Sequence, residues 1–456
     1  MMATPTPTPT STPTLTRPAA APATTPVTAA RNPRAAAVPS RTQKRRQLAF
    51  SVVAKPTGAA CNLNCQYCFF LSKELLYHTK RQQMSLETLD GYVQEYLAAS
   101  PDGEVTMIWQ GGEPTLRGLP FYEKLLELCE KYRRPRQRVT HAMQTNATLI
   151  DQDWARFLAD NDVLVGVSLD GPAELHDTYR VNRGGRGTHN MVVRGWQLLQ
   201  ERGVRCNILC TVHNGNESHP LEVYRYFRDT LGAEFLQFIP IVERVDAAAL
   251  ARVERDGWLG KGNDKTQILY QQKGDAVTSR STTPERYGCF LNTIFDEWKR
   301  RDVGQVFVQD FDAALGALFG QYSVCVHAPQ CGNNFALEFN GDVYACDHWV
   351  EPDWLVGNIA ETDFWSLAHG PVMRRFAAKK NQELPVECRR CPFLRLCNGG
   401  CPKDRFVGVH EGSAQNYLCP GYKAFYNHIM PDLLTMAQSL MASQESQRSV
   451  NGAGAS

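Results

Sequence analysis

The sequence predicts an α/β protein in which a partial barrel of six strand–helix units is followed by a cysteine-rich domain. Between residues 48 and 245, short apolar runs alternate with longer amphipathic stretches, which favours parallel strands joined by right-handed crossovers. Six units are two short of a closed eight-stranded barrel. Beyond residue 320, eight further cysteines gather between Cys325 and Cys419.

The first 47 residues are rich in Pro, Thr, Ala and Arg, and the first acidic residue of the chain is Glu74. Such a stretch cannot bury enough apolar area to fold, so we expect it to be disordered. Its composition also suits an organelle transit peptide. The Thr-Pro repeat between Thr4 and Pro13 argues against that and favours a cytoplasmic protein.

Two observations limit the partners. The formal net charge of +2 gives no reason to expect a nucleic-acid partner. The sequence has no run of eighteen apolar residues, so we expect no membrane span.

The alternation places each element of the barrel. Strands are predicted at residues 48–54, 105–109, 139–144, 163–169, 206–212 and 235–240. The helices between them are predicted at residues 85–99, 120–132, 152–160, 190–202 and 220–231. Residues 246–284 are polar, contain several glycines and lack periodicity, so they predict a long loop that orders on a substrate. This loop and the helices after it, beginning at 287–301, form a linking region over residues 246–320.

Residues suited to chemistry follow the strands, where function collects in such folds. They are, in chain order, Cys61, Cys65 and Cys68, then Gln110, Gly111, Gly112 and Glu113, then Thr145 and Asn146, then Ser168 and Asp170, then His213, and finally Ile241. Two adjacent glycines let a backbone approach a ligand closely, although they also suit an ordinary turn.

The three cysteines of the first loop have C-x3-C-x2-C spacing, with Tyr67 before the third. A four-iron cluster usually takes four thiolates, so three cysteines leave one iron open for a ligand that is not protein. The alternative is a structural zinc site, but zinc closes its shell with four ligands.

The second array consists of Cys325, Cys331, Cys346, Cys388, Cys391, Cys397, Cys401 and Cys419, which equals two sets of four thiolates. A pair of zinc sites is the alternative, because the spacing of Cys388 and Cys391 is common in zinc sites. The remaining cysteines, Cys129, Cys206, Cys210 and Cys289, are expected to be small apolar residues of the core.

The first loop resembles the signature of the radical S-adenosylmethionine (SAM) enzymes, in which the open iron binds SAM and reduction yields methionine and a 5′-deoxyadenosyl radical. This resemblance implies that Gln110, Gly111, Gly112 and Glu113 hold the amino group of SAM. It implies contacts of Ser168 and Arg180 with its ribose and carboxylate. Tyr67 and Ile241 would contact the adenine.

The second array resembles the SPASM auxiliary-cluster domain, expected here over residues 321–430. The resemblance implies that one [4Fe–4S] cluster is held by Cys325, Cys331, Cys346 and Cys401. A second would be held by Cys388, Cys391, Cys397 and Cys419, giving three clusters in all. Fully ligated clusters suit electron transfer better than substrate binding. A helix end and flexible tail are expected at residues 431–456.

Residues 50–429 resemble the anaerobic sulfatase-maturating enzymes most, through Cys346-Asp347 and the run from Asn398 to Phe406. The resemblance implies oxidation of a cysteine or serine, in a C/S-x-P-x-R motif of a sulfatase, to Cα-formylglycine. It implies that Asp347 accepts the proton and that a flavodoxin- or ferredoxin-like protein supplies electrons. Read without the family, Asp347 suits a solvated turn.

One departure concerns Phe69-Phe70, where relatives often carry tyrosines; Gln110 is the candidate to replace a missing hydroxyl. The runner-up function is another SPASM-type modifier that forms a thioether or carbon–carbon crosslink on a precursor peptide. A non-catalytic iron–sulfur or zinc scaffold is a third reading, which the full set of SAM-contact residues disfavours.

Overall fold

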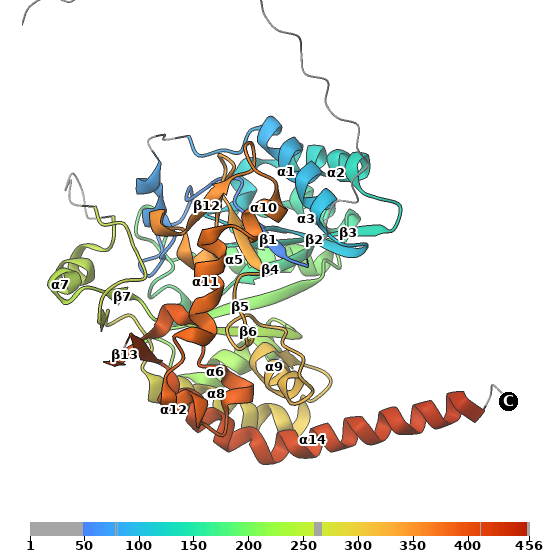
Figure 1. The fold of residues 1–456 in the computed structure, drawn as a ribbon, viewed down its shortest axis with the longest axis vertical. Helices are drawn as coiled ribbons and strands as arrows, with labels where there is room; N and C mark the ends of the chain where they lie inside the picture. Colours follow the sequence, from blue (N-terminus) through green and yellow to red (C-terminus); the bar gives the residue numbers. More distant parts are fainter. Residues whose placement is uncertain (1–48, 78, 80, 260–266, 411, 454–456) are drawn as a thin grey trace, which may run out of the picture. The chain divides into compact units, whose positions relative to one another are not determined.

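The computed structural model describes residues 49–77, 79, 81–259, 267–410 and 412–453 (Figure 1). The segment predicted to be a disordered leader, residues 1–47, lies outside this description. The described residues form one compact unit.

A ten-stranded sheet forms the centre of the fold, and its first six strands are parallel neighbours in chain order. They are β1 (Ser51–Ala54), β2 (Gly103–Trp109), β3 (Gln137–Thr145), β4 (Leu164–Ser168), β5 (Cys206–Val212) and β6 (Phe235–Pro240). This confirms the partial barrel, and the fifth and sixth strands have the predicted bounds. The first strand begins three residues later than predicted.

Both edges of the six-stranded core are extended rather than joined. On one side, β9 (Phe307–Val308) pairs in parallel with β6. On the other, β10 (Asn334–Leu337) pairs in parallel with β1. It is followed by the antiparallel strands β11 (Asp342–Tyr344) and β12 (Leu355–Asn358). The start of the cysteine-rich region therefore continues the sheet of the barrel.

Helices connect the parallel strands: α1 (Leu86–Ala99), α2 (Leu119–Tyr132), α3 (Gln152–Asp160), the short α4 (Ala173–His176), α5 (His189–Glu201) and α6 (Pro220–Arg225). Local signals begin them, since Ser85 accepts a hydrogen bond from Thr88 N at 3.0 Å and Asp151 accepts one from Trp154 N at 2.9 Å. The fifth predicted helix differs from expectation, because α6 passes into a π-helical segment, η3 (Tyr226–Thr230).

The predicted loop at 246–284 is wrong in part. It contains the helix α7 (Ala247–Asp256), flanked by the strand pair β7 (Arg244–Val245) and β8 (Ala276–Val277). Alanines favour a helix even where the apolar face is narrow, and here Val253 alone in the helix is buried, in a cluster with Val245, Trp258 and Tyr270. Residues 260–266 of the predicted loop lie outside the description.

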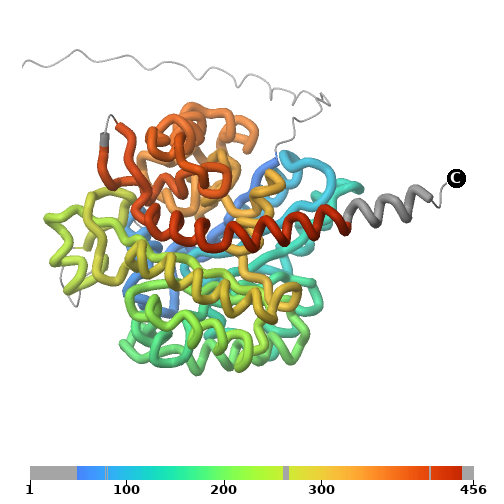
Figure 2. The backbone as a smooth tube through the Cα atoms, turned by 90° about the horizontal axis from the view of Figure 1, so that it is seen from below, coloured from blue at the N-terminus to red at the C-terminus, as the bar shows by residue number. Residues whose placement is uncertain are grey.

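Three longer helices support the second half of the chain: α8 (Pro284–Arg301), α9 (Gln309–Leu318) and α14 (Cys419–Ala453). For residues 431–456 we predicted a helix end followed by a flexible tail. The helix is longer than predicted, because α14 continues through Pro431 to Ala453. The tubes of α14 and α8 run side by side (Figure 2). A Cβ on Gly288 of α8 would lie 2.8 Å from the Gly421 carbonyl oxygen of α14, so the two backbones touch.

Short elements fill the rest of the cysteine-rich region: α10 (Phe364–Ala368), α11 (Pro371–Gln382), α12 (Val386–Arg389), α13 (Leu394–Cys397) and the hairpin of β13 (Arg405–His410) and β14 (Ser413–Asn416). The 3-10 turns are η1 (Leu71–Leu76), η2 (Pro114–Arg117), η4 (Asp347–Trp349), η5 (Pro352–Trp354) and η6 (Pro402–Asp404). Among the helices described, none is long and apolar enough to cross a membrane.

Candidate active site and thiol groups

A cavity with about 1860 Å³ of empty space lies at the carboxyl ends of the barrel strands. It is lined from both halves of the chain. The predicted site residues on its wall are Cys61, Cys65, Tyr67, Cys68, Gln110, Gly111, Gly112, Ser168, Arg180, Ile241 and Asp347. The structure therefore brings nearly all of the predicted cofactor contacts and the predicted proton acceptor to one space.

The cysteine loop after β1 is held by backbone hydrogen bonds, from Asn64 N to Val181 O at 2.8 Å and from Gln66 N to Tyr179 O at 3.0 Å. Burial raises the pKa of the Cys65 thiol to about 12, and it raises the pKa values of Cys61 and Cys68 as well. Buried thiols of this kind ionise when a metal centre supplies positive charge.

The donor set on the cavity wall fits an iron–sulfur cluster. Cys61, Cys65 and Cys68 line one cavity, and cysteine thiolates are the usual ligands of such clusters. In the part of the chain that the structure describes, no three His, Cys, Asp or Glu side chains are arranged to hold one metal ion.

The glycine pair after β2 allows a close contact, as predicted, but the contact is with the backbone of the protein and not with a ligand. A Cβ on Gly112 would lie 2.0 Å from the carbonyl oxygen of Ala60, and Gly111 has a φ of +125°. Gly112 N donates to Gly58 O at 2.8 Å. The pair therefore seats the end of β2 directly against the loop that leads into Cys61.

Glu113 lies behind the wall of the cavity, not on it. Its carboxylate accepts hydrogen bonds from the backbone and hydroxyl of Thr115, from the Thr145 hydroxyl at 2.7 Å and from Asn146 N at 2.8 Å. Asn146 in turn points its amide nitrogen at the Cys61 sulfur, 3.7 Å away. In this structure Glu113 holds the neighbouring strand end in place.

Arg180 and Tyr67 meet at Asp170, to which sequence reasoning gave no role. The Arg180 guanidinium pairs with the Asp170 carboxylate at 2.8 and 3.1 Å, and the Tyr67 hydroxyl donates to it at 2.5 Å. Burial opposes the charge of Asp170, but Arg180 and His213 outweigh burial and lower its pKa to about 2. An acidic residue two positions after Ser168 was the available signal.

Asp347 begins the short turn η4 directly after Cys346, and its carboxylate is paired with the ammonium of Lys55. Lys55 is 1% exposed and follows β1, and its Nζ lies 3.6 Å from the centre of the Phe70 ring. Burial opposes the charge of Asp347, but Lys55 and His348 hold its pKa below the usual range. Sequence reasoning missed Lys55, which is 292 residues away along the chain.

Aromatic contacts surround Phe69, one of the two phenylalanines that depart from the family resemblance. The Phe69 ring lies 5.3 Å from the His348 ring and 6.3 Å from the Tyr270 ring. Gln110, the predicted replacement, lines the same cavity.

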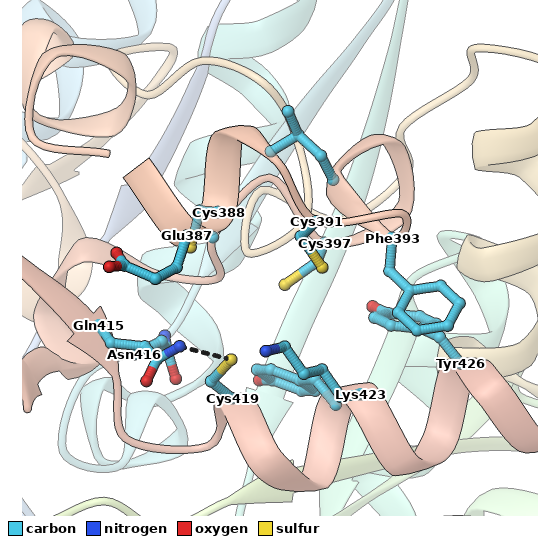
Figure 3. Close-up of a pocket in the computed structure, with 13 residues that line it drawn as sticks. Glu387, Cys388, Cys391, Phe393, Cys397, Gln415, Asn416, Cys419, Lys423 and Tyr426 are labelled. Carbon is cyan, nitrogen blue, oxygen red and sulfur yellow. Dashed lines mark hydrogen bonds between the residues drawn. The ribbon is translucent and has the colours of Figure 1, made fainter. Parts of the chain in front are cut away.

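A second, much smaller cavity is lined by Cys388, Cys391, Cys397 and Cys419 (Figure 3). The labelled sulfurs face a common space between the helix start at Cys419 and the short helices α12 and α13. Gln415 donates from its amide nitrogen to the Cys419 sulfur at 3.3 Å. Burial, together with the nearby thiols of Cys419 and Cys388, raises the pKa of Cys397 to about 12. These four residues are one of the two predicted ligand sets.

The other predicted set also comes together. Burial raises the pKa of Cys346, and the thiols of Cys401 and Cys325 raise it further because they lie close. Burial also raises the pKa of Cys331, and the nearby thiol of Cys325 raises it further. The buried Lys380 ties two of the segments, donating to Val326 O at 2.6 Å and to Gly400 O at 2.7 Å.

The four remaining cysteines differ in burial. Cys129, Cys206 and Cys210 are buried in the core, as predicted. Cys289 is exposed on α8, so the prediction of a core residue is wrong there. Every cysteine of the chain is a free thiol in the structure.

Comparison with known families finds two matches. The radical SAM superfamily model matches residues 56–227. The SPASM iron–sulfur cluster-binding domain model matches residues 325–392.

Among curated relatives, the serine-type anaerobic sulfatase-maturating enzyme of Bacteroides thetaiotaomicron is 40% identical over 396 residues, covering 86% of this chain and 92% of that protein. The cysteine-type enzyme of Clostridium perfringens is 34% identical and covers 86% and 99%, respectively. Among solved structures, anSMEcpe with bound AdoMet and the Cp18Cys peptide superposes with a TM-score of 0.72 at 33% identity, covering 86% of this chain and 99% of that one.

Proposed function

Because the chain belongs to the family of anaerobic sulfatase-maturating enzymes, we propose that it oxidises a cysteine or serine of a sulfatase to Cα-formylglycine. One observation carries the proposal beyond the family: Asp347 lies on the wall of the cavity that also holds the three loop cysteines. Its neighbour Cys346 belongs to a separate group of four thiols. In this proposal Asp347 is the proton acceptor, and the electron acceptor is the cluster held by the group to which Cys346 belongs.

We assign one [4Fe–4S] cluster to each thiol group. The first is held by Cys61, Cys65 and Cys68. The second is held by Cys325, Cys331, Cys346 and Cys401, and the third by Cys388, Cys391, Cys397 and Cys419. When bound, these groups and SAM supply the 5′-deoxyadenosyl radical that removes a hydrogen atom from the substrate Cβ, and an acceptor for one electron.

The residues on the cavity wall hold SAM in place in this proposal. Ser168, Arg180, Tyr67 and Ile241 line its ribose, carboxylate and adenine. Asp170 fixes Arg180 and Tyr67 in position: its Oδ2 accepts from Tyr67 and from Arg180 Nε, and its Oδ1 accepts from Arg180 Nη2. Gly111 and Gly112 set the distance between the cysteine loop and the next strand, and Gln110 faces the same space.

Asp347 takes the proton of the substrate hydroxyl or thiol, and Lys55 keeps its carboxylate in place. The change balances: one hydrogen atom leaves Cβ, one proton goes to Asp347 and one electron leaves. A serine then becomes the aldehyde directly. A cysteine becomes a thioaldehyde, which water converts to the aldehyde with release of hydrogen sulfide.

The partners follow from the same proposal. The substrate is a sulfatase segment with the C/S-x-P-x-R motif. A flavodoxin- or ferredoxin-like protein is the source of electrons. A structure of SuiB from Streptococcus suis aligns with a TM-score of 0.55 at 15% identity, and this likeness concerns the fold alone.

Mass spectrometry tests the proposal. The anaerobically reconstituted protein is incubated with SAM, a chemical reductant, and either a Cys-x-Pro-x-Arg or a Ser-x-Pro-x-Arg peptide. We expect a product that forms a hydrazone, and the serine peptide should lose two hydrogens. A peptide with alanine at the reacting position is the control. A crosslinked product that does not react with hydrazine would overturn the proposal.

A further inference from the structure

The main cavity holds one carboxylate more than its ion pairs account for. Its lining carboxylates belong to Glu243, Asp310, Asp347 and Asp404. Asp347 is paired with Lys55, Glu243 with Arg280 at 2.8 Å, and Asp404 with Lys403 at 2.6 Å. Within the residues that the structure describes, Asp310 has no cationic partner within 4.0 Å.

The lining cations are likewise engaged elsewhere. Lys55 and Lys403 belong to the pairs just named, and Arg180 is held by Asp170. No lining lysine or arginine is left for Asp310.

Hydrogen bonds do little to replace the missing counter-charge. The Tyr287 hydroxyl lies 3.4 Å from the Asp310 carboxylate but 3.0 Å from Phe238 O, and it has one proton to donate. Asp310 lies in the first turn of α9, where a helix favours negative charge. Burial nevertheless raises the pKa of Asp310 to about 7, against hydrogen bonds from the Phe238 backbone and from Tyr287.

Aromatic rings border this end of the cavity. Phe238, Tyr287 and Tyr422 line it with Asp310, and the Tyr287 and Tyr422 ring centres are 6.2 Å apart. A guanidinium stacks on aromatic faces and binds a carboxylate through two parallel hydrogen bonds, whereas an ammonium is more strongly hydrated. The chemistry of this corner therefore suits arginine better than lysine.

We propose that Asp310 is a specificity-determining residue that binds the guanidinium of the arginine in the substrate peptide. This inference rests on the proposed function, in which the arginine follows the reacting residue by four positions. Four residues span at most ~14 Å when extended. Asp347, which faces the reacting residue in the proposed function, and Asp310 line the same cavity.

Peptide binding tests the assignment without relying on turnover. The full-length holoenzyme with SAM is titrated under anaerobic conditions with a fluorescent Ser-x-Pro-x-Arg peptide and with its citrulline counterpart, which has nearly the same shape and no charge. Wild-type protein should bind the citrulline peptide at least ~10-fold more weakly, as expected for a desolvated charge pair. The Asp310→Asn variant should bind both peptides equally.

Asp312→Asn is the matched control, because Asp312 is in the same first turn of α9 but is exposed and does not line the cavity. It should keep the wild-type preference for arginine. Asp310→Glu retains the carboxylate and should keep at least part of that preference. Since Asp310→Asn removes a partly buried charge without a counter-charge, it should also raise the melting temperature of the peptide-free holoenzyme.

Two results would overturn the assignment. One is an unchanged preference for arginine in Asp310→Asn. The other is a loss of SAM affinity in that variant without peptide, which would mean that Asp310 serves SAM. Failure of the proposed function has a different signature: no peptide yields an aldehyde with the wild-type enzyme, whether or not arginine affects binding.

Discussion

At the scale of single residues, the pair of Lys55 and Asp347 is the most consequential contact in the cavity. Both ends are shielded from water, with 1% and 18% exposure, so each charge depends on the other. Removing either partner leaves a poorly solvated charge. The lysine keeps the carboxylate ionised, which the proposed role of Asp347 as proton acceptor requires.

Replacing Asp347 by asparagine tests its role in proton removal. The change is nearly isosteric and leaves the neighbouring thiols in place, so iron content should hold. Loss of a general base typically reduces rates by ~10²–10⁴-fold, so formylglycine should fall by at least ~10²-fold. Hydrogen abstraction precedes proton loss, and 5′-deoxyadenosine should still appear.

Deuterium at the substrate Cβ provides the control, since the label should reach 5′-deoxyadenosine in the variant as in the wild type. Melting temperature should be recorded in parallel, because Lys55 loses its counter-charge. A wild-type yield of aldehyde from the variant would remove Asp347 from the mechanism. Asp404, which also lines the cavity, would then be the next carboxylate to test.

At the scale of elements, contacts between backbones set the position of the thiol groups. The end of β2 seats against the cysteine loop at Gly112 and Ala60. The α14 helix, which begins at Cys419, seats against α8 at Gly421 and Gly288. In both places glycine lets two backbones approach beside a predicted cluster cysteine, and a side chain would prevent this approach.

Alanine should have opposite effects on stability at two helix glycines, one inside the contact between α8 and α14 and one in open space. Gly288→Ala forces a Cβ to 2.8 Å from Gly421 O, and such overpacking costs about 1–3 kcal/mol. Gly91→Ala in α1 meets no atom within 4 Å and should stabilise by about 0.8–1 kcal/mol through helix propensity.

Thermal unfolding of the two variants beside the wild type provides the measurement. Gly288→Ala should melt below the wild type and Gly91→Ala should melt slightly above it. Equal melting temperatures for the two variants would show that the helices separate easily and that the close packing contributes little.

At the scale of the whole molecule, the extended sheet joins the two halves of the chain. The parallel pairing of β10 with β1 sets Leu337 beside Ala54, so the residues after these strands become neighbours. As a result, Lys55 from the barrel meets Asp347 from the cysteine-rich region. The site therefore depends on both halves being folded together.

Three thiol groups predict about twelve irons per reconstituted chain, four for each cluster. Alanine at Cys61, Cys65 and Cys68 should remove about a third of the iron and all SAM cleavage. Alanine at Cys388, Cys391 and Cys397 should also remove about a third, but SAM cleavage should persist. Metal analysis and 5′-deoxyadenosine assays measure both; zinc in place of the auxiliary iron would contradict the assignment.

The sequence by itself determined the features that depend on local order. Strand and helix periods placed the six parallel strands, and cysteine spacing marked the first loop and the array of eight cysteines. The division of that array into two sets of four came from the family resemblance, not from spacing. Helix α7 was missed because its single buried residue, Val253, leaves almost no periodic pattern to read. Cys289 was misplaced because helix position alone does not reveal which face is covered.

Only the tertiary structure decided which charges meet. Lys55 pairs with Asp347, and Asp170 binds both Tyr67 and Arg180. Glu113 binds Thr145 and Asn146 and so lies away from the cavity. Each of these contacts joins residues that lie apart in the chain. The same holds for Asp310: that it has no cationic partner among the described residues depends on how the other lining charges are paired. Local patterns depend on a few neighbouring residues, whereas charge pairing depends on where the folded backbone carries each side chain.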